Sequence, residues 1–295
     1  MAICQFCKGE SETLFKTKDL NRGISQNDFE YLHCPACKTI SISKIPEDLN
    51  NYYLQEYYRI PTLAKLKRIA RAERFKINMI KNFAHSGSLL EVGAAFGVFA
   101  YQAKAAGFEV DAIEMDDRCC KFLSNVIGVN AIKTDAPEKI VGSLKKHDVI
   151  AMWHVLGHLA NPWESLSAMA KNLSMNGLLV VATPNPEAFQ FRIMGKKWPH
   201  IDAPRHLNLI PREALTQYLK RFGLELVMLT TNDQGGKSWN RFGWQRYLMN
   251  SFPGKWMQRI SFIVGYLLSL PMILWDQNNF NGCAYTAIFQ KKVER

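Results

Sequence analysis

The middle of the chain combines two periodicities of apolar and polar residues. Short apolar runs predict strands, and the longer stretches between them repeat apolar residues at helical spacing. The predicted strands are Ser88–Val92, Phe108–Glu114, Asn130–Lys133, His147–Trp153 and Leu178–Ala182. Regular alternation of strand and helix predicts an α/β fold with a doubly wound, mostly parallel sheet. In such a sheet, ligands bind at the carboxyl ends of the strands.

The flanking segments show other patterns. Residues 63–83 have the spacing of an amphipathic helix, and we expect 46–85 to form a helical linker and cap. Residues 260–275 are strongly apolar, but they number 16 and include Pro271, whereas a spanning helix needs roughly 20 residues. We therefore expect a buried helix with an exposed hydrophobic side here, and peripheral contact with a membrane stays open.

The length of 295 residues suits one large domain and a small accessory module, because single cores stop growing near roughly 250–300 residues. A hydrophobic share of 47% and a charged share of 21% are typical of globular proteins and exclude a disordered chain. We expect a module at 1–45, a core domain at 86–232 that includes a lid at 184–210, and an extension at 233–295 that completes the sheet.

Four cysteines form two Cys-x-x-Cys pairs near the N-terminus, Cys4 with Cys7 and Cys34 with Cys37. Two such pairs suit tetrahedral Zn²⁺, and they predict a structural zinc ribbon. Chance pairing, disulfides and His33 as a substitute ligand are the alternatives. The sequence shows no secretory leader, which favours a reducing cytoplasm over a disulfide framework. The other cysteines, Cys119, Cys120 and Cys283, are expected to be buried apolar residues.

A glycine-containing turn follows the first predicted strand. Gly93 and Gly97 allow the backbone to approach a ligand closely, and Glu91 at the strand end can meet a cationic or hydroxyl-bearing group. Glu114 ends the next strand about twenty residues on, where a carboxylate can bind ribose hydroxyls. The glycine turn and the two strand-end carboxylates together imply a nucleotide-type cofactor. The turn is not the dinucleotide fingerprint, because Ala95 replaces a middle glycine.

The chain resembles the class I S-adenosylmethionine-dependent methyltransferases, in particular the group with an N-terminal zinc ribbon that acts on sugars, lipid carriers and small molecules. The resemblance covers nearly the whole chain and rests on four motifs: Cys4-x-x-Cys7 with Cys34-Pro-Ala-Cys37, Leu90-Glu-Val-Gly-Ala-Ala-Phe-Gly97, the segment Asp148–His158, and the segment Trp198–His206. One departure is Gly157, where related enzymes usually carry a glutamate before the histidine. A catalytic divalent metal is therefore not implied here.

The resemblance implies S-adenosylmethionine as cofactor and, as its site, Glu91, Gly93, Ala94, Ala95, Phe96, Gly97, Glu114, Met115, Asp135, Ala136, Trp153 and His154. The turn would cradle the methionine and ribose end, and Glu114 would bind the ribose hydroxyls. Asp135 and Ala136 would flank the adenine, and Trp153 and His154 would line the inner wall.

Methyl transfer to oxygen or carbon requires a group that accepts a proton, for which histidine is suited. His206 and His158 are the candidate catalytic residues, with packing or lid support as the alternative role for each. Arg205 could bind a phosphate or carboxylate of the acceptor, or pair with Asp202 instead. Trp198 is expected to supply an aromatic wall for the acceptor, or else to pack the lid.

The formal charge of +11 favours an anionic partner without selecting among nucleic acid, anionic lipid and acidic small molecules. We weigh two rival functions: a nicotinamide-dependent oxidoreductase on a similar sheet, and a non-catalytic zinc-ribbon protein that binds nucleic acid. The altered glycine turn disfavours the first, and no aromatic and basic strand pattern supports the second. A small-molecule acceptor, anionic or lipid-linked, is the expected partner. The sequence indicates neither the methylated atom nor the oligomeric state.

Overall fold

The computed structural model describes residues 2–53, 59–252, 254–278 and 280–292. The chain forms two compact units, each assembled from separate stretches. Unit 1 comprises Met1–Tyr52, Thr183–Leu215 and Leu229–Thr286, and unit 2 comprises Tyr53–Ala182, Thr216–Met228 and Ala287–Arg295. This division differs from the consecutive regions expected from the sequence, because each unit takes in segments that are distant along the chain.

A seven-stranded sheet has the strand order β11-β12-β9-β8-β5-β6-β7. Strands β5 to β9 are paired in parallel. The strands are β5 (Gly87–Val92), β6 (Phe108–Glu114), β7 (Asn130–Lys133), β8 (His147–Trp153), β9 (Leu173–Pro184), β11 (Leu224–Thr230) and β12 (Ala284–Lys291). The predicted α/β fold and its five predicted strands are confirmed. The predicted C-terminal contribution to the sheet corresponds to β12.

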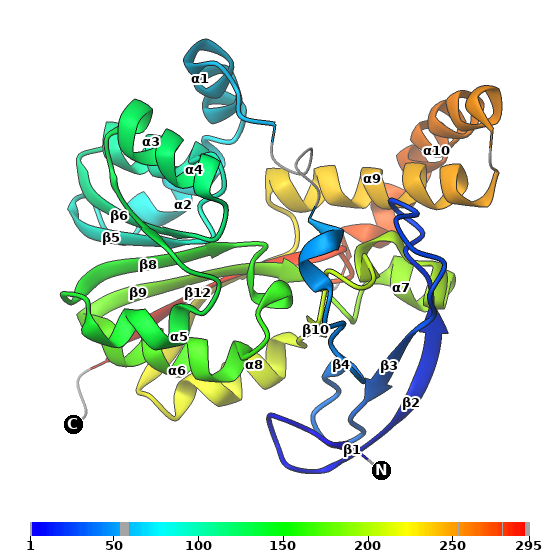
Figure 1. The fold of residues 1–295 in the computed structure, drawn as a ribbon, viewed down its shortest axis with the longest axis horizontal. Coiled ribbons are helices and arrows are strands. Elements are labelled where there is room, and N and C mark those ends of the chain that lie inside the picture. Colours follow the sequence, from blue (N-terminus) through cyan, green and yellow to red (C-terminus); the bar gives the residue numbers. More distant parts are fainter. Residues whose placement is uncertain (1, 54–58, 253, 279, 293–295) are drawn as a thin grey trace. The chain divides into compact units, whose positions relative to one another are not determined.

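In unit 2, helices cover both faces of the sheet (Figure 1). One face carries α1 (Leu63–Ala72), α2 (Phe75–Lys81), α3 (Val98–Ala105) and α4 (Asp117–Phe122), and the other carries α5 (Pro137–Ile140) and α6 (Pro162–Asn172). The predicted helix over 63–83 is divided in two, because the chain leaves helical hydrogen bonding at Glu73 and Arg74. Further helical segments are α8 (Arg212–Lys220), a π-helical segment (Leu123–Ile127) and 3₁₀ segments at Leu49–Tyr52, Val141–Ser143, Leu156–His158, Gly195–Lys197 and Pro199–Ile201.

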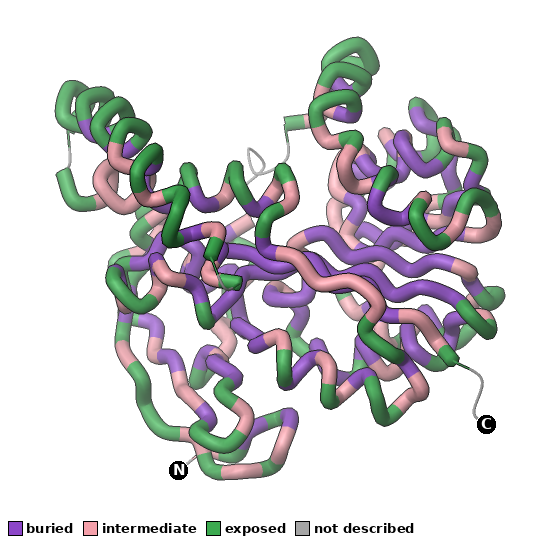
Figure 2. The backbone as a smooth tube through the Cα atoms, turned by 180° about the vertical axis from the view of Figure 1, so that it is seen from behind, coloured by how far each residue is buried: buried purple, intermediate pink, exposed green. Residues whose placement is uncertain are grey.

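One part of the unit 2 core lies between the sheet and the helices on the α3 face. Leu89, Ala112, Val149 and Val180 are fully buried, and they pack with Phe99 of α3. The strands of this sheet are accordingly coloured mostly as buried in Figure 2. Because parallel strands are covered on both faces, they appear in the sequence as continuous apolar runs.

Unit 1 contains a second, antiparallel sheet of order β1-β2-β3-β4-β10. Its strands are β1 (Ala2–Ile3), β2 (Glu10–Thr17), β3 (Phe29–His33), β4 (Ile40–Ile42) and β10 (Asn208–Leu209). The predicted module at 1–45 therefore takes its last strand from residues 208–209, where Asn208 pairs with Ser41. Tyr31, Trp198 and Leu209 belong to one buried cluster, so this sheet and the 198–209 segment share a core.

The helices of unit 1 are α7 (Phe189–Met194), α9 (Gln234–Ser251) and α10 (Lys255–Asp276). For the buried helix with an exposed hydrophobic side that was expected at 260–275, the exposed apolar side is confirmed, but the burial is wrong. α10 has 22 residues and a mean hydropathy of 1.5, and its length and composition would suffice to cross a membrane. It is also mostly exposed, with 17% of the apolar stretch buried, and its tube in Figure 2 is largely green.

Candidate functional site

The turn after β5 is held against the neighbouring strand β6. The amides of Gly93 and Ala94 both donate to the Ile113 carbonyl oxygen, at 2.8 and 3.2 Å. Gly93, Ala95 and Gly97 have positive φ values of 73°, 49° and 76°. A Cβ on Gly93 would lie 2.3 Å from the side chain of Val155, so the backbone conformation and the packing both require glycine there.

Glu91 precedes this turn and is buried in the sheet. Burial raises the pKa of its carboxyl to about 8, although Lys76 and the Ala100 amide counteract the shift. Among the residues that the structure describes, Oε2 of Glu91 has no hydrogen-bond partner. A buried acceptor without a partner is costly to the fold, which makes Glu91 a candidate ligand for a hydroxyl or a cation.

Glu114 connects the end of β6 to the same turn. Its Oε2 accepts a hydrogen bond from the Ala95 amide at 2.7 Å, and its Oε1 accepts from the amides of Met115 and Asp116 at 2.9 Å each. Burial raises the pKa of Glu114, and these three amides lower it again in part. The two strand-end carboxyl groups predicted from the sequence therefore flank one turn, and the charge of Glu114 contributes to the raised pKa of Glu91.

The other predicted cofactor residues lie at strand ends of the same sheet. Asp135 and Ala136 follow β7, with the Asp135 side chain exposed and the Ala136 amide donating to Thr134 Oγ1 at 3.1 Å. Trp153 ends β8 and packs edge-to-face on Phe99, with ring centroids 5.3 Å apart. Its indole Nε1 is buried and has no hydrogen-bond partner among the described residues.

The sequence interpretation missed two charged residues at the junction of α1 and α2, namely Glu73, which caps α1, and Lys76 in α2. Lys76 Nζ lies 2.6 Å from Glu73 Oε2 and 5.2 Å from the centre of the Trp153 ring. Its positive charge also lowers the pKa of Glu91. The amphipathic pattern at 63–83 indicated that this segment packs on the domain, but it gave no sign of which charged residue approaches Glu91 and Trp153.

We expect Glu91→Gln to raise the free energy of unfolding by roughly 3 kcal/mol at pH 7 in the absence of ligand. The folded-state pKa of about 8 lies above the ordinary value of 4.5, so Glu91 must take up a proton on folding, and this costs stability that grows between those two pH values. The gain should therefore be small near pH 4.5 and largest above pH 8. Urea unfolding at several pH values measures it, and a gain independent of pH would contradict the assigned ionisation.

His158, one of the two predicted catalytic histidines, lies in a 3₁₀ turn (Leu156–His158) after β8. Its Nδ1 is 3.0 Å from the Tyr53 hydroxyl, and the two rings are in edge contact. Gly157 directly before it is buried. In the part of the chain that the structure describes, the group of side chains suited to a metal is the cysteine cluster, and His158 is not in it.

The segment Trp198–His206 lies inside unit 1, with its side chains mostly buried. Arg205 is fully buried and forms ion pairs with Asp19 at 2.6 Å and with Asp202 at 2.8 Å. Trp198 is buried in the unit 1 core against Phe191. These contacts are the structural alternatives that the sequence left open for both residues. As acceptor ligands, Arg205 and Trp198 stay predictions.

His206 is buried next to His200. Its Nδ1 lies 2.8 Å from the His200 carbonyl oxygen, which can only accept, so Nδ1 carries a proton in this hydrogen bond. Burial lowers the pKa of His206, although nearby Asp202 raises it again in part. The ring is therefore neutral at neutral pH, which is the form in which histidine accepts a proton.

A cavity of about 610 Å³ opens beside these histidines within unit 1. His200, Asp202 and His206 line one part of it, and residues of α9 line another. The α9 residues include the aromatic pair Trp239 and Phe242 and the cationic Arg246. The sequence interpretation missed α9, because its apolar residues have no marked helical periodicity and nothing in its sequence relates it to residues 200–206.

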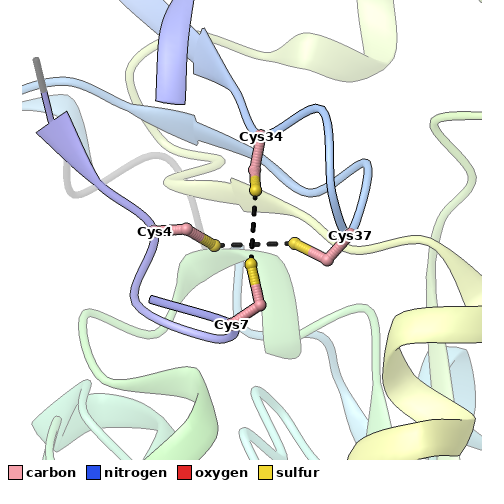
Figure 3. A group of neighbouring side chains, drawn as sticks. All are labelled: Cys4, Cys7, Cys34 and Cys37. Atoms are coloured by element: carbon pink, nitrogen blue, oxygen red, sulfur yellow. Dashed lines mark hydrogen bonds between the residues drawn. The ribbon is translucent and has the colours of Figure 1, made fainter. Parts of the chain in front are cut away.

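The four cysteines of the predicted ribbon converge on one point (Figure 3). Their sulfur atoms all lie within 4.8 Å of one another, with 3.5 Å between those of Cys4 and Cys37 and 3.3 Å between those of Cys7 and Cys34. Tetrahedral Zn²⁺ with Zn–S bonds of about 2.3 Å places its sulfur ligands roughly 3.8 Å apart. The donor set and spacing fit zinc, and His33 lies outside the group.

The two cysteine pairs have the same backbone geometry. The amides of Lys8 and Lys38 donate to the carbonyl oxygens of Cys4 and Cys34, and both lysines have positive φ values, 61° and 62°. This repeated turn presents both sulfur atoms of a pair to one centre. The remaining cysteines, Cys119, Cys120 and Cys283, are buried as predicted.

Comparison with known proteins identifies this architecture. The seven-stranded sheet has the Rossmann-like fold of class I S-adenosylmethionine-dependent methyltransferases. A methyltransferase of that class from Archaeoglobus fulgidus superposes with a TM-score of 0.50 at 18% identity, covering 77% of this chain and 94% of its own. Residues 58–229 match the methyltransferase domain family. The chain belongs to that family.

Curated relatives are similar over part of the chain. A ubiquinone biosynthesis O-methyltransferase of Saccharophagus degradans is 28% identical over 149 residues, which cover 47% of this chain and 63% of the relative. The enzyme of the same name from Cereibacter sphaeroides is 24% identical over 166 residues, covering 53% and 65%. The chain thus spans less than two thirds of the length of each of these relatives.

Proposed function

We propose that this protein is an S-adenosylmethionine-dependent methyltransferase that acts on a small-molecule, sugar or lipid-linked acceptor. The observation that carries the proposal is the arrangement of Glu91, the 93–97 turn and Glu114 at the carboxyl ends of β5 and β6. This is the edge of a doubly wound sheet at which nucleotide ligands bind. Membership of the methyltransferase family supports the same cofactor.

The buried polar atoms at this edge fit such a cofactor. Glu114 would accept hydrogen bonds from the ribose hydroxyls, and Glu91 Oε2 would gain the partner that it lacks among the described residues. Asp135 and Ala136 would flank the adenine, and Trp153 would line the wall beside it. When bound, S-adenosylmethionine supplies an electrophilic methyl group on a cationic sulfur.

We propose that the acceptor occupies the cavity beside His206. Two aromatic side chains and the guanidinium of Arg246 suit a flat or anionic molecule. His206 would take the proton that an oxygen acceptor loses as it is methylated, because its ring is neutral. The relatives' name, which specifies O-methylation, favours oxygen as the methylated atom.

The cofactor assignment is tested by calorimetry. The purified protein should bind S-adenosylmethionine and S-adenosylhomocysteine in the micromolar range, and 1 μM corresponds to about −8 kcal/mol. Glu114→Ala removes the carboxylate that meets the ribose and should weaken binding at least tenfold. Glu109→Gln, on the same strand but exposed in a surface ion pair with Lys145, is the matched control and should bind normally. Binding of a nicotinamide cofactor instead would overturn the proposal.

We also propose that Cys4, Cys7, Cys34 and Cys37 hold one structural Zn²⁺ per chain. The four thiolates complete a tetrahedral shell, so no position stays open for a catalytic water. The expected result is one equivalent of zinc in the parent and none in Cys34→Ser/Cys37→Ser. The double variant should still bind cofactor, because unit 2 has its own core. Stoichiometric zinc in the double variant, measured by metal analysis, would show that the metal lies elsewhere.

A further inference from the structure

Helix α10 is attached to unit 1 through a narrow face of small residues. Ser261, Gly265 and Ser269 are buried at intervals of four residues, and α10 packs against α9 along this face. A Cβ on Gly265 would lie 2.6 Å from the Gln245 Cα, so the two backbones are in close contact. At its end, Asp276 accepts hydrogen bonds from Trp244 Nε1 and Gln190 Nε2.

The opposite side of α10 exposes large apolar side chains. They recur every three or four residues and therefore form one stripe, which comprises Trp256, Ile260, Ile263, Leu267, Leu270 and Leu274. Trp256 and Leu274, near the two ends, are 75% and 72% exposed. Phe262, Tyr266 and Ile273 extend the exposed apolar surface around one flank. Soluble monomers rarely expose a continuous apolar surface of this length.

The charges around this stripe have a single sign. Residues 234–275 contain five basic residues and no acidic one. Lys255 and Arg259 lie in the first turns of α10, next to Trp256, and Arg259 stacks over that ring at 5.4 Å. From Ile260 to Trp275 there is no charged residue at all. The surface thus combines a basic end with an uncharged apolar length.

We propose that the exposed stripe of α10 docks on an anionic phospholipid bilayer, with the helix lying along the membrane surface. Its apolar side chains enter the boundary between headgroups and acyl chains, and Lys255 and Arg259 meet the lipid phosphates. Trp256 and Trp275 lie near the two ends, and tryptophan is enriched at the interface between membrane and water. The proposal stands independently of the methyltransferase assignment.

Two other occupants fit the surface less well. The stripe has the three-and-four spacing of a coiled-coil seam, but a seam is flanked by charged positions that select the partner, and here the flanks are apolar. A protein interface would also have a polar rim. If α9 and α10 spanned a membrane as a hairpin, Lys237, Arg241 and Arg246 of α9 would enter the hydrocarbon, which is costly. In addition, Asp276 and the face of small residues attach α10 to the rest of unit 1.

Vesicle flotation tests the proposal with the full-length protein. The parent should float with phosphatidylcholine vesicles in which about 30% of the lipid is anionic phosphatidylglycerol. With vesicles of phosphatidylcholine alone, the floated fraction should be at least tenfold smaller. High salt should weaken the binding, because it screens the basic residues. Ile263→Asp/Leu267→Asp should abolish it, and Lys255→Glu/Arg259→Glu should reduce it at least tenfold. These side chains are exposed, so circular dichroism and cofactor affinity should match the parent.

The matched control is Ile193→Asp, which changes an exposed apolar residue of α7 in the same unit and should leave flotation unchanged. Equal binding to both vesicle compositions, or no binding to either, would overturn the proposal. So would a soluble dimer that Ile263→Asp/Leu267→Asp dissociates in analytical ultracentrifugation, since the stripe would then join two copies. Protein that stays with the vesicles after alkaline extraction would indicate a spanning helix instead.

Discussion

Arg205→Ala is expected to lower the free energy of unfolding by about 3–5 kcal/mol. The substitution would leave two carboxylates, Asp19 and Asp202, without the guanidinium that lies between them. Removing one partner of a buried ion pair costs more than the pair itself contributes, because the remaining charge stays desolvated. Urea denaturation measures the loss, with Arg212→Ala as control, because Arg212 pairs with Glu187 at the surface and should cost less than about 1 kcal/mol.

The loss in Arg205→Ala should depend on pH in a defined direction. Burial raises the pKa of Asp202, but its hydrogen bonds and attraction to Arg205 outweigh burial and hold the pKa well below its usual range. A lowered folded-state pKa contributes stability above the ordinary value of 3.8 and loses it as the pH falls. The variant and the parent should therefore converge in acid. A difference that persists at low pH would mean that lost packing dominates.

His206→Ala should reduce turnover by about 10² to 10⁴ once an acceptor has been found, with cofactor affinity within a few-fold of the parent. Burial lowers the pKa of His206, so the ring is neutral at pH 7 and above, and turnover in the parent should not vary with the ionisation of His206 in that range. A labelled-methyl transfer assay with candidate acceptors provides the measurement.

One conservative variant separates a catalytic role of His206 from a structural one. His206→Asn places an amide nitrogen near the position of Nδ1, so it can still donate to the His200 carbonyl oxygen, but it contains no base. If His206 is catalytic, Asn should be as inactive as Ala although it is more stable. Recovery of turnover in the Asn variant would assign a structural role, and His158, which contacts Tyr53, would become the leading candidate.

The parallel sheet could be predicted from the sequence because its strands are buried on both faces. The bounds predicted for β6, β7 and β8 agree with the structure, and the polar residues Glu114 and Lys133 mark the ends of β6 and β7. The carboxylates at the strand ends followed from the same pattern. Predicting that Glu91 and Glu114 lie at one site required no knowledge of distant contacts, because strand order and the glycine turn bring them together.

Contacts between distant segments could not be predicted. β10 contains two residues, too few for any periodicity, and its partner β4 lies more than 160 residues earlier. Asp19, which pairs with Arg205, is likewise remote in the sequence. The length of α10 was underestimated because hydropathy finds only its uncharged part and omits the first turn, Lys255–Arg259. The exposure of α10 could not be predicted either, because the helix packs through the small residues Ser261, Gly265 and Ser269, and hydropathy does not distinguish them within an apolar run.

The discontinuity of the two units constrains how the chain is made. Both cysteine pairs lie between residues 4 and 37, so they are synthesised well before β10. The strand that completes the ribbon's sheet, β10, emerges about 170 residues later, and β12 closes the larger sheet only when residues 284–291 have been synthesised. Neither sheet can therefore be completed from one continuous stretch of the chain, and α10, with its exposed apolar stripe, is synthesised before β12.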